Sequence, residues 1–211
     1  MKKTGRFHVL TDTVVQDRYS HIELTEMALA GGADTIQFRS KSGSTRKLIE
    51  TALKMKELCS KADVPLIIND RVDVALASGA DGVHLGQDDF PIPLARKLLG
   101  ENAIIGGSAG NIEEAEICFK GGADYLGVGP VFATGSKSDA GPATGIERIK
   151  MIVNEFPMPV IAIGGITAAY ISELIDAGAH GIAVISAVCL EENPESAARN
   201  FSNTLSRYRK G

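Results

Sequence analysis

The chain has 211 residues and a formal net charge of −4 at pH 7, with 44% hydrophobic and 23% charged residues, a balance typical of globular proteins. The mild acidity argues against a nucleic-acid partner, and the lack of an apolar run of about 18 residues argues against a membrane span. Cys59, Cys118 and Cys189 lie far apart without the spacing of a metal site, so we expect reduced thiols in a cytoplasmic protein.

One short phrase occurs four times along the chain, as Gly32-Ala33-Asp34, Gly79-Ala80-Asp81, Gly122-Ala123-Asp124 and, ending in histidine, Gly178-Ala179-His180. Each copy follows an apolar stretch with helical spacing and precedes a short apolar run. Glycine suits the position after a helix because it has no Cβ to clash at positive φ. We therefore interpret each phrase as a helix end, a tight turn and the start of a buried strand.

Four further apolar runs lie between these phrases, which makes eight strand candidates. Val, Ile and Leu dominate them without a polar alternation, as expected for a parallel sheet covered on both faces. In chain order, we predict strands at Phe7–Thr11, Thr35–Phe38, Pro65–Asn69, Gly82–Leu85, Ala103–Gly107, Tyr125–Val128, Pro159–Ile163 and Gly181–Ile185. Helical spacing predicts helices at Ser20–Ala30, Ser44–Ala62, Val72–Ser78, Ile92–Leu99, Ile112–Lys120, Gly145–Phe156, Ala168–Ala177 and Glu195–Arg209.

This alternation predicts an α/β protein, a single (β/α)₈ TIM barrel that occupies residues 1–211 as one domain. An open doubly wound sheet is the alternative, but eight even units suit it less well. Most connections are short, whereas the segment 129–145 is long and rich in small residues. Long loops in compact domains are usually functional or disordered, and this one carries Thr134, Ser136 and Lys137 among glycines. We expect it to close over a phosphate.

Two cations and an amide follow the second predicted strand. Gln37, Arg39 and Lys41 are spaced two apart, so in extended chain they share one side. Arginine matches phosphate with two parallel hydrogen bonds, and the set predicts an anion-binding edge at the catalytic end of the barrel. A solvated basic edge is the alternative.

Two carboxylates follow the next strands. Asn69 and Asp70 end the third strand, and Asp89 comes shortly after the fourth. Because consecutive strands are neighbours in a barrel, Asp70 and Asp89 can converge beside the cations, where they would hold Mg²⁺ with substrate oxygens and water. Alternatively, each aspartate caps the helix that follows it. His84 lies in the fourth strand, and we expect it to be buried and hydrogen-bonded rather than a metal ligand.

The later strand ends carry small polar residues and glycines. Ser108 follows the fifth strand, and Asn111 is predicted to cap the next helix. Gly164 and Gly165 follow the seventh strand, and Ser186 follows the eighth. The loops after strands seven and eight of such barrels commonly bind phosphate through backbone N–H groups, so we expect a phosphorylated ligand here.

Taken in order, the motifs Gln-x-Arg-x-Lys, Asn-Asp, His-x-Gly-Gln-x-Asp, Gly-x-Ser, Thr-x-Ser-Lys, Ile-Gly-Gly-Ile and Ile-Ser resemble those of the thiamine phosphate synthase family, from about Phe7 to Arg209. The resemblance implies a transferase of thiamine biosynthesis. It would join 4-amino-2-methyl-5-hydroxymethylpyrimidine diphosphate to a thiazole phosphate, pass through a pyrimidine-methylene carbocation and release pyrophosphate. That route needs no general base.

The resemblance also implies a role for each matching residue. The pyrimidine diphosphate would be held by Gln37, Arg39, Lys41, Asn69, Lys137 and Ser108, of which Arg39, Lys41, Lys137 and Ser108 would assist catalysis. Mg²⁺ would be held by Asp70 and Asp89. The thiazole phosphate would be held by Thr134, Ser136, Gly165, Ile185 and Ser186. The partners are thus small molecules, and a homo-oligomer is left open.

Three positions depart from the family pattern: Ser40, Gly107 and Gly110. Gly110 stands where the related thiazole tautomerases carry the histidine proposed as their acid–base group. Its presence argues against that isomerase, which remains an alternative. A non-catalytic paralogue that binds a phosphorylated ligand is a second alternative. A sugar-phosphate isomerase or aldolase is more distant, because no strand carries a suitable lysine.

Overall fold

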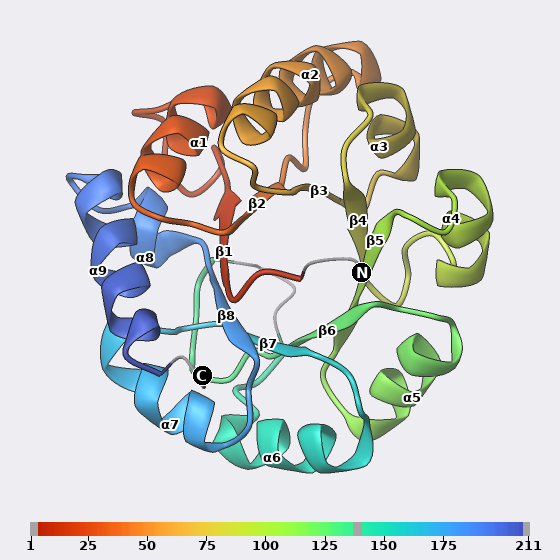
Figure 1. The fold of residues 1–211 in the computed structure, drawn as a ribbon, viewed down its shortest axis with the longest axis vertical. Helices are drawn as coiled ribbons and strands as arrows, with labels where there is room; N and C mark the ends of the chain where they lie inside the picture. Colours follow the sequence, from red (N-terminus) through yellow and green to blue (C-terminus); the bar gives the residue numbers. More distant parts are fainter. Residues whose placement is uncertain (1–3, 137–140, 209–211) are drawn as a thin grey trace.

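Eight parallel strands close into a barrel in the order β1 to β8, and helices surround it (Figure 1). This closed, all-parallel arrangement confirms the predicted (β/α)₈ TIM barrel. The computed structural model describes residues 4–136 and 141–208. The strands are β1 (Phe7–Thr11), β2 (Thr35–Phe38), β3 (Leu66–Asn69), β4 (Gly82–Leu85), β5 (Ile104–Ala109), β6 (Tyr125–Val128), β7 (Val160–Ile163) and β8 (Gly181–Val184).

The helices follow the predicted order, with one addition. They are α1 (His21–Ala30), α2 (Thr45–Lys61), α3 (Val72–Ser78), α4 (Ile92–Leu99), α5 (Ile112–Lys120), α6 (Gly145–Glu155), the 3₁₀ turn η1 (Ala168–Tyr170), α7 (Ile171–Asp176), α8 (Ser186–Cys189) and α9 (Pro194–Ser206). The short helix α8 lay outside the prediction because four residues are too few to show a helical period. Strand β5 runs two residues further than predicted, so Ser108 lies inside it.

The four repeated phrases end helices as interpreted. Gly32, Gly79, Gly122 and Gly178 have φ angles of 89°, 63°, 84° and 95°. The third residue of each phrase then donates its backbone N–H to a residue at the start of the preceding strand, as Asp34 does to the Phe7 carbonyl at 3.1 Å. Each phrase thus joins two neighbouring strands at the N-terminal end of the barrel.

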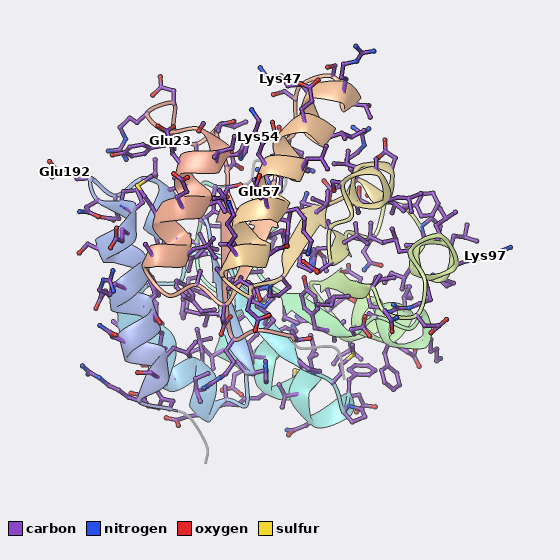
Figure 2. All side chains as sticks on the ribbon, turned by 45° about the horizontal axis from the view of Figure 1, so that its top comes forward. Glu23, Lys47, Lys54, Glu57, Lys97 and Glu192 are labelled. Carbon is purple, nitrogen blue, oxygen red and sulfur yellow. The ribbon has the colours of Figure 1, made fainter. Side chains whose placement is uncertain are left out.

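The core has two apolar layers. Leu10, Ile67, Tyr125 and Ile161 belong to the set of side chains that fill the barrel itself. A larger layer lies between the strands and the helices. Charged side chains such as Lys54, Glu57 and Lys97 occupy the outer faces of the helices (Figure 2). Buried strand interiors and solvated helix exteriors leave the strand ends as the place for polar chemistry.

All three cysteines are buried free thiols. None of the described helices is both long and apolar enough to cross a membrane.

Candidate active site

A cavity of about 590 Å³ opens at the C-terminal ends of the strands. Small-molecule sites commonly occupy roughly 300–1,000 Å³. Its lining includes most of the predicted site residues: Arg39, Lys41, Asn69, Asp70, Asp89, Ser108, Thr134, Ser136, Gly165, Ile185 and Ser186. Gln37 is not part of this lining, and Lys137 lies outside the described residues.

Arg39 directly follows β2 and is anchored from β1. Its backbone N–H donates to the Thr11 carbonyl at 3.2 Å. Its Nη1 donates to Oδ2 of Asp12, and both side chains are nearly inaccessible, at 7% and 1% exposure. The alternative of a solvated basic edge is therefore wrong for Arg39, which is buried in an ion pair.

Gln37 lies inside the barrel and is not part of the cavity lining. It is buried and hydrogen-bonds the Tyr125 hydroxyl inside the barrel. Tyr125 also shares a hydrogen bond of 3.0 Å with His84 Nδ1, and His84 Nε2 lies 2.9 Å from Ser108 Oγ. His84 is thus buried and hydrogen-bonded, as predicted. The chain of contacts links the barrel interior to Ser108 at the cavity wall.

The two predicted metal-binding carboxylates meet at the cavity rim. Asp70 has a φ of 64° and accepts a hydrogen bond of 2.6 Å from Lys41 Nζ. Burial raises the pKa of Asp70, the hydrogen bond and charge of neighbouring Asp89 raise it further, and Lys41 opposes both. Asp89 Oδ2 in turn accepts the Gly86 N–H at 2.7 Å.

The alternative role of these aspartates as helix caps is wrong. The N-cap of α3 is Arg71, and that of α4 is Pro91, neither with a side-chain capping bond. Asn111, by contrast, caps α5 as predicted, because its side chain accepts the Glu114 N–H at 2.8 Å.

Asp70, whose pKa is raised, lies against a second carboxylate, and such a pair suits a divalent cation, which would relieve the mutual repulsion. Within residues 4–136 and 141–208, no group of three or more His, Cys, Asp or Glu side chains gathers as a metal site. Mg²⁺ typically takes one or two protein carboxylates and completes its shell with substrate oxygens and water. The pair therefore fits Mg²⁺ better than a metal that needs a full protein cage.

Hydroxyl groups gather at the ends of β6 to β8. Ser136 Oγ lies 2.9 Å from Ser186 Oγ and 3.3 Å from Thr134 Oγ1. The segment after β6 follows the end of β7, since Val131 N–H donates to Ile163 O at 2.9 Å. At Gly165, φ is 65°, and a Cβ would lie 2.6 Å from Ala133 O, so this close approach requires glycine.

The family model described as thiamine monophosphate synthase matches residues 7–188. The chain belongs to this family. Thiamine-phosphate synthases from Salinibacter ruber and Methanocella arvoryzae are 49% and 48% identical to it, covering 95% and 96% of this chain and 88% and 95% of their own lengths. The solved structure of a thiamine phosphate pyrophosphorylase from Pyrococcus furiosus matches with a TM-score of 0.88 at 40% identity, covering 96% of both chains.

These relatives confirm the family that the motifs predicted, and with it a transferase of the thiamine phosphate synthase kind. A solved structure entitled "Native KDPGal structure" matches with a TM-score of 0.74 at 16% identity, which shows the shared barrel alone.

Two residues at this site had no role predicted from the sequence: Asp12, and Gln87, which stands within the His-x-Gly-Gln-x-Asp motif. Gln87 Nε2 donates to the Ser108 carbonyl at 2.6 Å and lines the cavity. Asp12 holds Arg39. A signal for Asp12 was present, because Thr11-Asp12 directly ends the first strand, as Asn69-Asp70 ends the third.

Proposed function

We propose that this chain joins 4-amino-2-methyl-5-hydroxymethylpyrimidine diphosphate to a thiazole phosphate, forming thiamine phosphate and releasing pyrophosphate. One observation carries the proposal. Arg39 and Lys41 share a cavity with the Asp70–Asp89 pair, while the hydroxyls of Ser136 and Ser186 meet at strand ends on its other side. A site with two anion-binding ends suits two phosphorylated substrates.

The pyrimidine diphosphate is assigned to the end formed by β2 to β5. Arg39, Lys41 and Asn69 lie at the cavity wall there, and Ser108 lies beside them. Lys137 belongs to this assignment through the family motif. As the C–O bond to pyrophosphate breaks, negative charge develops on the leaving oxygens, and fixed cations placed there lower the barrier.

Asp70 and Asp89 would hold Mg²⁺. When bound, the ion supplies further positive charge to the departing pyrophosphate. The chain itself contributes the two carboxylates. Because the pKa of Asp70 is raised, two unneutralised charges are unfavourable here, and a bound cation would relieve that cost.

The thiazole phosphate is assigned to Thr134, Ser136, Gly165, Ile185 and Ser186, which line the cavity near β7 and β8. Held there, the thiazole nitrogen can form the new C–N bond to the pyrimidine methylene carbon. Fixing both reactants in one cavity supplies the orientation that the reaction needs. No side chain has to remove a proton in this route.

The thiazole tautomerase alternative finds less support at this site. Gly110 has no side chain, and its backbone N–H is engaged with Glu114 Oε2 at 2.7 Å. The position therefore offers no acid–base group to an isomerase.

The proposal is tested by incubating the chain with both phosphorylated precursors, with and without Mg²⁺, and measuring thiamine phosphate and pyrophosphate. We expect Mg²⁺-dependent formation of both products. Folded protein that binds pyrophosphate without coupling would contradict the proposal and indicate the regulatory paralogue. Isomerisation of the thiazole phosphate without the pyrimidine substrate would instead indicate the tautomerase.

A further inference from the structure

Asp12 is placed beside Arg39 by the pairing of the first two strands. Thr11 and Phe38 are partners in the β1–β2 ladder, so the next residue on each strand reaches the same level. Side chains alternate along β1, with Leu10 inside the barrel and Thr11 bonded to His21 of α1 on the outside. Asp12 therefore turns back toward the barrel axis, where Arg39 lines the cavity.

The Asp12 carboxylate is held on both oxygens. Oδ1 accepts the backbone N–H groups of Val14 and Val15 at 2.7 and 3.3 Å. Oδ2 accepts Arg39 Nη1. Because two backbone donors tie one oxygen to the β1–α1 loop, the carboxylate is a fixed anchor rather than a mobile counter-ion.

Arg39 has a donor that none of the described residues uses. Its Nε is buried yet lacks a hydrogen-bond partner among the residues that the structure describes. Buried polar groups are nearly always hydrogen-bonded, so an unpaired donor on a residue that lines the cavity calls for an explanation, and a bound anion would supply one. Arginine binds phosphate oxygens through such donors.

We propose that Asp12 is a positioning residue that fixes the Arg39 guanidinium at the cavity wall, so that the donors Asp12 does not hold serve the diphosphate of the pyrimidine substrate. This rests on the proposed function for the identity of that substrate. Asp12 acts only through Arg39. Holding the arginine in its binding rotamer reduces the entropy lost when the anion binds.

Asp12→Asn tests this, because asparagine keeps the volume and the Oδ1 acceptor while removing the charge that holds Nη1. The readouts are the dissociation constant of inorganic pyrophosphate with Mg²⁺, measured by calorimetry, and KM for the pyrimidine diphosphate. We expect both to rise by about tenfold or more, because a charge-assisted contact is misplaced.

Asp124→Asn is the matched control. Asp124 directly precedes β6, at the opposite end of the barrel. Its carboxylate likewise accepts a backbone N–H, that of Ile105 at 2.8 Å, and an arginine donor, Arg96 Nη2 at 2.7 Å. The Asp124→Asn substitution should leave pyrophosphate binding unchanged. If the dissociation constant of pyrophosphate rose no more for Asp12→Asn than for Asp124→Asn, the proposal would be overturned. Wild-type protein that fails to bind pyrophosphate would overturn it as well.

Arg39→Gln supplies the second arm. If Asp12 acts through Arg39, the double variant Asp12→Asn/Arg39→Gln binds pyrophosphate within about twofold of Arg39→Gln alone. Removing both charges also avoids a buried unpaired cation, so this comparison survives if Asp12→Asn alone does not fold. A further loss in the double variant would refute positioning. Pyrophosphate binding is measured in the absence of the two substrates. A failure of the protein to join those substrates would therefore appear in the coupling assay and not in the binding assay.

Discussion

At the scale of single residues, the most informative side chain is Asp70. Its backbone has a positive φ of 64°, its carboxylate is partly buried, and it lies against Asp89. Each of these features costs free energy of folding in an ordinary position. Strain that persists at a cavity rim is typical of a functional site, since the surrounding structure must hold it in place.

Asp70→Asn should therefore separate activity from stability. Asparagine tolerates positive φ, so the turn is kept. The pKa of Asp70 is higher in the folded protein than in the unfolded chain. The wild-type protein therefore loses stability as the pH rises above the pKa of the unfolded aspartate, whereas Asp70→Asn does not. At pH 7 we expect the variant to unfold at the same or a higher temperature, while the rate of coupling falls by about 100-fold.

The matched control is Asp73→Asn, which removes an exposed partner of Arg71 on α3. It should change neither turnover nor, beyond a few tenths of a kcal/mol, the free energy of unfolding. Melting curves with and without Mg²⁺ add a readout independent of activity. Mg²⁺ should raise the melting temperature of wild type and of Asp73→Asn but not of Asp70→Asn. An equal rise in all three would contradict the assignment of Asp70 to the metal.

At the scale of elements, the Gly-Ala-Asp phrases do more than end helices. The carboxylates of Asp34 and Asp81 accept the backbone N–H of Phe7 and Leu66, at 2.7 and 2.8 Å. Asp124 does the same for Ile105. Each aspartate thus holds the start of the preceding strand with both its backbone and its side chain. The repeat builds the N-terminal end of the barrel and leaves the opposite end free for chemistry.

Gly79→Ala and Gly178→Ala test what glycine contributes to this repeat. Both positions have positive φ, which costs a residue with a Cβ about 1–2 kcal/mol. A Cβ at Gly79 would meet no atom within 4 Å, whereas one at Gly178 would lie 2.7 Å from Val153 Cγ1. Chemical denaturation should show a loss near that range for Gly79→Ala and a larger one for Gly178→Ala. If both variants lost the same free energy of unfolding, the close contact between residue 178 and Val153 of α6 would contribute nothing to the loss.

At the scale of the whole molecule, two buried histidines make the fold sensitive to acid. Burial lowers the pKa of His8, inside the barrel, to about 4, despite the opposing charge of Asp34. Burial also lowers the pKa of His21, between α1 and β1, to about 4 against the charge of Asp12. Both imidazoles stay neutral in the folded protein at pH values where they become charged in the unfolded chain.

The free energy of unfolding should therefore fall as pH drops through 6.5 and stop falling from this cause near pH 4. When folding lowers a histidine pKa, no stability is lost above the pKa of the unfolded histidine. Below it, each of the two histidines lowers the free energy of unfolding by up to about 3 kcal/mol. Urea denaturation of wild type and His21→Asn at pH 7 and pH 5 measures this. The variant should lose less stability between the two pH values, and an equal loss would contradict the assignment to His21.

The sequence by itself determined the barrel and its strand order. Helical spacing, apolar runs and glycines at positive φ are local signals, and they recur often enough along this chain to specify each βα unit. The cations after β2 and the carboxylates after β3 and β4 could be placed at one rim, because parallel strands end together.

Only the tertiary structure decided which side chains meet. The Asp12–Arg39 pair depends on the register of β1 against β2, and the placement of Gln37 outside the cavity lining depends on Tyr125 reaching it across the barrel. The link from His84 to Ser108 depends on β5 extending past its apolar run. These contacts join residues far apart in the chain, and periodicity within one segment contains no information about the partner that another segment brings.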